Sequence, residues 1–324
     1  MKEVFGTSSV IEEGRADARQ KAREGRKPGR NFIFSILITL LVYIIAQVIM
    51  SLAMGCYMAF DLMRTTDITQ DFSFTLDSND LMTSNSVIVM LYSEIVMIIA
   101  FFICARAIEK RKLTSLGFVK KNMVPSYLIG IAGGIGFMLV DALICKFTDA
   151  MTFKYSGISV IKLVLFAGGW MIQGLAEEVM CRGYLLTSIS RRYSVTLAVV
   201  ANSVLFALLH IFNPSGMNGL ALFNLFLYGV FASLLFLRSG NIWLCAGFHS
   251  AWNMMQGNVL GIPVSGINVE SIYMSSADLS MGVVNGGAFG FEGGIGVTLL
   301  LLIGCIILMI TRSKNCNSPL EKCK

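Results

Sequence analysis

The chain has 324 residues, of which 55% are hydrophobic and only 14% charged, with a formal net charge of +6 and a mean hydropathy of +0.70. Soluble domains carry about a quarter charged residues, so this composition excludes a soluble globular protein and predicts an integral membrane protein. The positive charge does not indicate nucleic-acid binding, because the basic N-terminal segment has no interleaved aromatic residues and directly precedes an apolar run.

The first thirty residues predict a basic tail. They lack the short apolar core and small-residue cleavage site of a signal peptide, so the first apolar run is expected to remain as a membrane anchor. We assign residues 1–30 to the tail, 31–311 to one transmembrane domain and 312–324 to a C-terminal tail. No linker or internal repeat indicates a second domain.

Eight apolar runs are long enough to be membrane helices and predict an all-α polytopic bundle. They are residues 32–59, 86–107, 123–146, 158–182, 195–213, 217–237, 241–258 and 294–311. If the N-terminus is cytoplasmic, 21 of the 26 Lys and Arg residues fall on the cytoplasmic side, so we expect both termini there. The acid-rich loop 61–80 is then outside.

Glycine patterns in two segments have an architectural interpretation. Gly130 and Gly134 form a GxxxG pair in the third span, which is typical of close helix packing. The glycine-rich segment 286–296 follows no expected strand and precedes no GK[ST], so it predicts a flexible outer or re-entrant loop rather than a phosphate-binding loop. The eight scattered cysteines form no CxxC pair and are expected to be packing residues.

Ionisable residues inside the spans each need a partner or a function, because burying one in a bilayer costs roughly 2.5–3.5 kcal/mol. Glu94 and Asp141 are two of them, and either lines a cavity or pairs within the bundle. The fourth span contains three more in the stretch EEVMCR. Glu178 and Arg182 stand four residues apart in the favourable order for a helical ion pair, whereas Glu177 lies about 100° around the helix and is left unpaired.

Both histidines of the chain also lie within apolar spans. His210 ends the stretch FALLH, and His249 stands one turn before Asn253 in HSAWN. One histidine on an apolar face is most often structural, but two of them with an amide one turn away favour a shared polar site. Straight spans would place His210 nearer the outer half than Glu177, so a tilt, a break or a shifted start of the fifth span is expected to bring it inward.

These residue types are those of a peptide hydrolase. A glutamate and a histidine, Glu177 and His210, can deprotonate a water, while His249 and Asn253 can stabilise a developing oxyanion. The three residues Glu177, His210 and His249 also match the ligand number of a catalytic zinc site, and the sequence leaves that alternative open. No HExxH, GxSxG or GxGD motif points to another protease class.

The three stretches match the EExxxR, FxxxH and HxxxN motifs of the CAAX-processing and bacteriocin-processing (CPBP, or Abi) intramembrane proteases, and the chain resembles that family over about residues 160–260. The resemblance implies an eight-helix membrane peptidase with a four-helix catalytic core. It also implies a metal-free mechanism in which Glu177 and His210 activate water. His249 and Asn253 would form the oxyanion hole, and Glu178 with Arg182 would support the site.

The outer loops are similar to those of bacterial family members, which implies a bacterial plasma-membrane protein whose substrate is a hydrophobic or lipid-anchored peptide or protein. An alternative is a non-catalytic membrane scaffold, or a bacteriocin-immunity or sensor-regulating protein of the same fold. A transporter is disfavoured because the sequence shows no repeated halves or paired broken spans.

Overall fold

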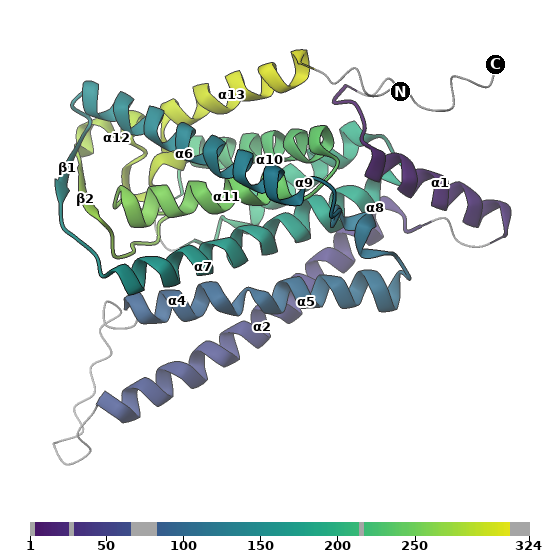
Figure 1. Ribbon diagram of the computed structural model, residues 1–324, viewed down its shortest axis with the longest axis horizontal. Helices are drawn as coiled ribbons and strands as arrows, with labels where there is room; N and C mark the ends of the chain where they lie inside the picture. Colours follow the sequence, from purple (N-terminus) through teal and green to yellow (C-terminus); the bar gives the residue numbers. More distant parts are fainter. Residues whose placement is uncertain (1–3, 26–28, 66–82, 214–216, 312–324) are drawn as a thin grey trace.

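The computed structural model describes residues 4–25, 29–65, 83–213 and 217–311, which form a bundle of helices with one small sheet at one end (Figure 1). The predicted all-α polytopic fold is confirmed. Within the described residues, five helices are long and apolar enough to cross a membrane. They are Phe32–Arg64, Ser84–Ile108, Met123–Phe147, Val160–Ser190 and Gly219–Ser239, and shorter apolar helices cover Val195–Leu209 and Ile295–Ile310. The chain is an integral membrane protein.

Each of the eight predicted apolar runs contains a helix, and α1, α8 and α12 lie outside these runs. The α-helices of the described residues are α1 (Ser9–Arg23), α2 (Phe32–Thr65), α4 (Ser84–Ser93), α5 (Ile95–Ile103), α6 (Met123–Phe147), α7 (Val160–Glu178), α8 (Thr187–Ser190), α9 (Val195–Leu209), α10 (Gly219–Ser239), α11 (Trp243–Met254), α12 (Gly282–Asn285) and α13 (Ile295–Ile310). Short π-helical segments extend α5, α7 and α11 at Cys104–Ile108, Val179–Leu186 and Met255–Val259. The predicted C-terminal tail and residues 66–80 of the acid-rich loop lie outside the described residues.

Half of the predicted N-terminal tail is a docked helix. In α1, Val10, Ile11, Gly14 and Ala18 are buried and form one stripe. Arg15 donates from Nε to the carbonyl oxygen of Ser190 and from Nη2 to that of Tyr193, at 2.9 and 3.2 Å. The N-terminal segment is therefore attached to the end of the bundle that carries α8 (Figure 1).

Glycines bring α6 and α11 into direct backbone contact. A Cβ on Gly130 would lie 2.3 Å from the carbonyl oxygen of Leu244, and one on Gly134 would lie 2.5 Å from that of Phe248. Neither position has space for a side chain, so the predicted GxxxG packing is confirmed. This contact fixes the position of α11, which carries the HSAWN stretch.

The opposite end of the bundle contains structure that the sequence did not predict. Strands β1 (Met151–Tyr155) and β2 (Tyr273–Ala277) pair antiparallel, with Met151 opposite Ala277. The glycine-rich segment is packed rather than a flexible outer loop, since Phe289 and Phe291 are buried. Gly290 has φ of 96°, and a Cβ there would lie 1.9 Å from the carbonyl oxygen of Pro263, so only glycine fits.

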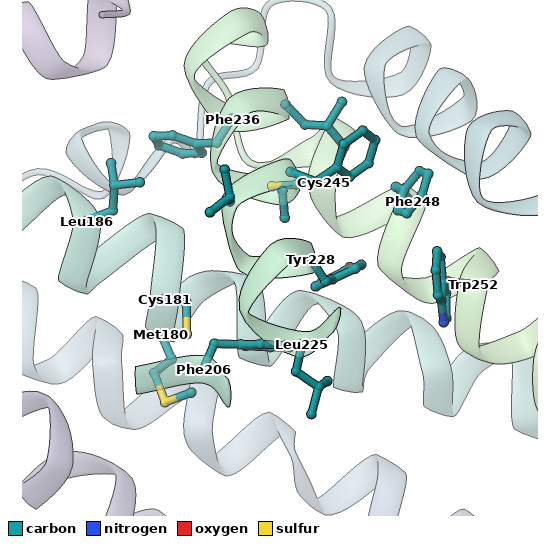
Figure 2. Close-up of a cluster of buried hydrophobic side chains, with 14 of the residues drawn as sticks. Met180, Cys181, Leu186, Phe206, Leu225, Tyr228, Phe236, Cys245, Phe248 and Trp252 are labelled. Atoms are coloured by element: carbon teal, nitrogen blue, oxygen red, sulfur yellow. The ribbon is translucent and has the colours of Figure 1, made fainter. Parts of the chain in front are cut away.

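The hydrophobic core surrounds the middle of α7, α9, α10 and α11. Figure 2 shows Met180, Cys181 and Phe206 close to Tyr228, with Phe248 and Trp252 on the neighbouring helix. The six cysteines within the described residues are free, and all but Cys56 are buried, as expected for packing residues. Cys316 and Cys323 lie outside the described residues.

Candidate active site

The EEVMCR stretch lies where the backbone changes from α-helix to π-helix. α7 ends at Glu178, and the π-helical segment begins at Val179. Such segments often occur at functional sites, because they alter which side chains share a helix face. Arg182 Nη1 lies 3.0 Å from Glu178 Oε1, and both side chains are fully buried, so the predicted ion pair is present.

Arg182 is held from two further sides. Its Nη2 donates to the carbonyl oxygen of Gly229 at 3.3 Å, and its guanidinium lies 4.9 Å from the centre of the Phe206 ring. These contacts compensate in part for the removal of a charged group from water. Arg182 therefore links α7 to α9 and α10 behind the site.

Glu178 has a second partner that the sequence did not predict. His249 Nδ1 lies 3.0 Å from Glu178 Oε1, and a carboxylate accepts, so Nδ1 carries the proton in this contact. The two helices can approach because Gly174 faces α11, where a Cβ would lie 2.9 Å from the backbone nitrogen of Ser250. His249 Nε2 is left facing Glu177, at 3.7 Å from Oε2.

Glu177 has one carboxylate oxygen that is satisfied and one that is not. Oε1 accepts from Gln173 Nε2 at 2.8 Å, whereas Oε2 is buried and has no hydrogen-bond partner among the described residues. Gln173 in turn accepts from Asn253 Nδ2 at 2.9 Å. Gln173 was missed in the sequence, where its only signal is a polar side chain one turn before Glu177 on the same helix face.

His210 lies just beyond the last residue of α9, which ends at Leu209 instead of reaching residue 213. Its Nδ1 lies 2.8 Å from the carbonyl oxygen of Phe206, so that nitrogen is the donor and Nε2 is left for other contacts. No hydrogen bond joins His210 to Glu177 within the part of the chain that the structure describes. α9 therefore ends before His210, and His210 and Glu177 line the same cavity.

One cavity of about 910 Å³ brings these side chains together. Glu177, His210, His249 and Asn253 all line it, whereas Glu178 and Arg182 lie behind its wall. A volume of this size is at the upper end of the range of ligand pockets. The structure thus gathers the four candidate catalytic residues, from three helices, around one space.

The two acids that the sequence left unassigned differ. Glu94 lies between α4 and α5 and lines the same cavity. Asp141 does not line it, and packs against α13, where a Cβ on Gly296 would lie 1.9 Å from Asp141 Oδ1. Both Asp141 oxygens are buried without a hydrogen-bond partner among the described residues. Glu94 belongs to the cavity, whereas Asp141 belongs to a helix contact.

Residues of α2, α4 and α5 form another part of the cavity lining. This part is mainly apolar and contains Glu94 and five methionines: Met50, Met54, Met58, Met90 and Met97. Methionine side chains adapt to irregular apolar partners. In Figure 1, α2 runs away from α4 toward its C-terminal end. The cavity therefore combines the candidate catalytic groups with adaptable methionine side chains.

The described residues contain no group of three His, Cys, Asp or Glu side chains arranged to hold a metal ion. The alternative triad of Glu177, His210 and His249 lines the cavity without forming such a group. His249 also gives Nδ1 to Glu178. We therefore derive no step through a metal.

A comparison with protein families matches residues 159–255 to the family described as type II CAAX prenyl endopeptidase Rce1-like. Over these residues the chain is similar to this family. The resemblance to CPBP proteases is thereby confirmed, and the match implies a CAAX-type protease. The matched segment runs from the residue before α7 to the residue after α11, which spans all three motifs. No curated protein is similar enough to the chain to count as a match.

Proposed function

We propose that the protein is an intramembrane endopeptidase that hydrolyses a peptide bond in a membrane-associated or lipid-anchored peptide or protein. The observation that carries this proposal is the Glu177 carboxylate, whose Oε2 is buried without a hydrogen-bond partner among the described residues and faces a cavity that also contains both histidines. An unsatisfied acceptor in such a cavity is suited to bind and deprotonate a water molecule.

In the proposed reaction, Glu177 Oε2 takes a proton from a water that His210 helps to orient through Nε2. The water oxygen attacks the carbonyl carbon of the scissile bond, and the carbonyl oxygen becomes an oxyanion. Glu177 then returns the proton to the amine nitrogen as the carbon–nitrogen bond breaks, which leaves a carboxylic acid and an amine. Gln173 holds Glu177 Oε1 and so fixes the direction of Oε2.

His249 and Asn253 are the proposed oxyanion donors. His249 gives Nδ1 to Glu178, and its Nε2, which lies 3.7 Å from Glu177 Oε2, is the nitrogen proposed to donate to the oxyanion when it carries a proton. Asn253 uses one amide hydrogen for Gln173 and keeps a second for the oxyanion. Glu178, neutralised by Arg182, orients His249 and does not itself touch the substrate.

The methionine side chains that α2, α4 and α5 contribute to the cavity support a hydrophobic segment or lipid anchor as the part of the substrate that is bound. Lys21, Arg30, Arg111 and Arg191 lie together near α1 and α8, which supports a cytoplasmic location for that end of the bundle and for both termini. We propose a bacterial plasma membrane as the location.

The decisive experiment measures cleavage of a lipid-anchored peptide by the purified protein and two variants. Glu177→Gln and His210→Ala are each expected to lower kcat by about 10²–10⁴-fold, because each removes a group that handles a proton. Glu13→Gln, the same substitution on the exposed face of α1, is the matched control and is expected to keep full activity.

Cleavage by Glu177→Gln at the wild-type rate would overturn the assigned mechanism. If Glu177→Gln also restores the phenotype of a strain that lacks the protein, the chain is a scaffold or immunity protein of the same fold. Activity that is lost on chelation and restored by zinc would overturn the metal-free mechanism.

A further inference from the structure

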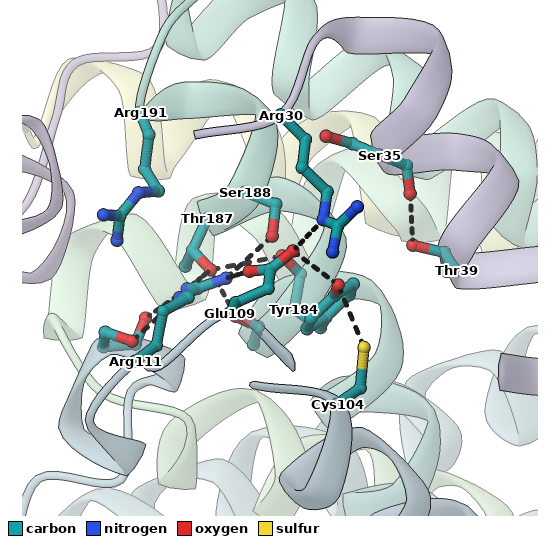
Figure 3. A network of polar contacts seen from close by, with 12 residues as sticks. Arg30, Ser35, Thr39, Cys104, Glu109, Arg111, Tyr184, Thr187, Ser188 and Arg191 are labelled. Atoms are coloured by element: carbon teal, nitrogen blue, oxygen red, sulfur yellow. Dashed lines mark hydrogen bonds and ion pairs between the residues drawn. The ribbon is translucent and has the colours of Figure 1, made fainter. Parts of the chain in front are cut away.

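A second, smaller pocket lies at the end of the bundle that carries α1, on the far side of Tyr184 from the candidate site. Its volume is about 330 Å³, and it is lined by residues from α1, from the segment before α2, from the end of the π-helix that extends α5 and the residues after it, and from α8 and the residue after it. Figure 3 shows its polar side chains, with Arg30 and Arg111 on either side of Glu109. The proposed peptidase chemistry uses none of them.

The pocket has an excess of positive charge. Lys21, Arg30, Arg111 and Arg191 line it together with one carboxylate, Glu109. Asp17, outside the lining, pairs with both Lys21 and Arg191. Two carboxylates for four cations leave two positive charges uncompensated, and a concave pocket concentrates their field.

Arg111 forms the fixed floor of this pocket. It is 4% exposed, and its guanidinium donates to Ser188 Oγ at 2.7 Å and to Glu109 Oε2 at 3.2 Å. Further bonds to Thr187 and Ser115 satisfy its remaining donors. Arg111 therefore contributes charge and rigidity and has little capacity to bind a ligand directly.

The donors that remain belong to the other cations. Arg30 uses Nε for Glu109 Oε1 at 3.1 Å, and its two terminal nitrogens have no hydrogen-bond partner among the described residues. Arg191 gives Nη2 to Asp17 and keeps Nη1, while Lys21 Nζ has two hydrogens beyond its bond to Asp17. Guanidinium groups with free donors match the geometry of a phosphate.

The surroundings of the pocket are those of a membrane boundary. Ile108, which lines the pocket, is 55% exposed. On the adjoining first turns of α2, Ile33 and Leu37 are 67% and 56% exposed. These apolar surfaces suit contact with acyl chains, and they begin where the basic pocket ends. A ligand with a phosphate and attached hydrocarbon satisfies both features.

We propose that this pocket binds the phosphate headgroup of an anionic phospholipid whose acyl chains lie along the outer surfaces of α2 and α5. The site is separate from the candidate active site and does not depend on the proposed peptidase activity. The bound lipid joins α1 to the bundle, since Lys21 comes from α1 and Arg30 from the residues before α2.

The test uses the full-length protein in neutral detergent. The shift in its thermal unfolding midpoint is measured against dihexanoyl phosphatidylglycerol, dihexanoyl phosphatidylcholine and inorganic phosphate. Phosphatidylglycerol is expected to raise the midpoint, because a ligand that binds the folded state stabilises it. Lys21→Gln/Arg30→Gln is expected to weaken that binding by at least about tenfold, since each basic residue near an anionic surface contributes a factor of about five.

Lys120→Gln/Lys121→Gln removes two exposed cations outside the pocket and is the matched control, expected to stay within about twofold of wild type. Equal loss in both double variants would overturn the pocket, because it would show only general attraction. Equal affinity for inorganic phosphate would overturn the lipid assignment. If Lys21→Gln/Arg30→Gln does not fold, Lys21→Gln alone gives the same comparison against Lys120→Gln.

Discussion

Two adjacent glutamates in one helix have different surroundings, and this difference separates structure from proposed chemistry. Glu178 is fully buried between Arg182 and His249, at 3.0 Å from each. Glu177 is held by Gln173 through one oxygen and leaves the other toward the cavity. Loss of the Glu178 charge should therefore mainly lower stability, whereas loss of the Glu177 charge should mainly lower activity.

We expect Glu178→Gln to lower the free energy of unfolding by roughly 3–5 kcal/mol, because it leaves Arg182 as a buried charge without its carboxylate. Glu177→Gln keeps the hydrogen-bonding shape of the side chain and is expected to change stability by less than about 1 kcal/mol. Chemical or thermal unfolding in the same detergent measures both. Equal loss of stability in the two variants would contradict the separate roles.

At the scale of the elements, glycines set the distances between the helices that carry the site. α6 packs against α11 through Gly130 and Gly134, and α7 packs against α11 through Gly174. His249 and Asn253 lie on α11, so their distance from Glu177 depends on these backbone contacts. Gly136, two residues after Gly134 on α6, has no atom within 4 Å of an added Cβ.

This pair of glycines on α6 provides a matched test. In Gly134→Ala the methyl group meets backbone atoms, 2.5 Å from the Phe248 oxygen and 3.0 Å from the Trp252 nitrogen, so the helices must separate. We expect a loss of roughly 1–3 kcal/mol in stability and lower peptidase activity. Gly136→Ala is expected to be neutral or to stabilise by up to about 1 kcal/mol. Similar unfolding midpoints in the two variants would refute the close contact.

At the scale of the whole molecule, α1 closes the end of the bundle that is rich in basic residues. Asp17 on α1 pairs with Arg191, which follows α8, and with Lys21 on its own helix. Burial raises the pKa of the Asp17 carboxyl, but hydrogen bonds from Lys21 and Arg191 outweigh burial and hold its pKa below the usual 3.8. The docking of α1 therefore depends on an ionised carboxylate.

A lowered pKa means that this contribution to stability is complete above the unfolded value of 3.8 and is lost as pH falls through the lower folded value. We expect hydrogen exchange of the α1 amides, corrected for the intrinsic rate, to accelerate below about pH 4 in the wild-type protein. Asp17→Asn should show faster exchange already at pH 7 and a weaker dependence on acid. Unchanged α1 protection in Asp17→Asn at pH 7 would show that the apolar stripe alone holds the helix.

Several features follow from the sequence because their cause is local. Apolar runs of membrane length predict the helices, and the spacing of Glu178 and Arg182 predicts their ion pair, since residues four apart lie on one helix face. The three motifs predict the family, which the match over residues 159–255 confirms. Catalytic roles for Glu177, His210, His249 and Asn253 stay predictions.

Other features depend on which helices are neighbours, and helical periodicity does not specify neighbours. The contacts of His249 with Glu178 and of Asn253 with Gln173 join residues 71 and 80 positions apart. The pairing of β1 with β2 and the docking of α1 likewise bring distant segments together. Local spacing thus determined the helices and the Glu178–Arg182 pair. Only tertiary packing determined which helices are neighbours, because the glycine contacts between them leave no room for side chains. That packing formed the cavity and placed the polar side chains around it.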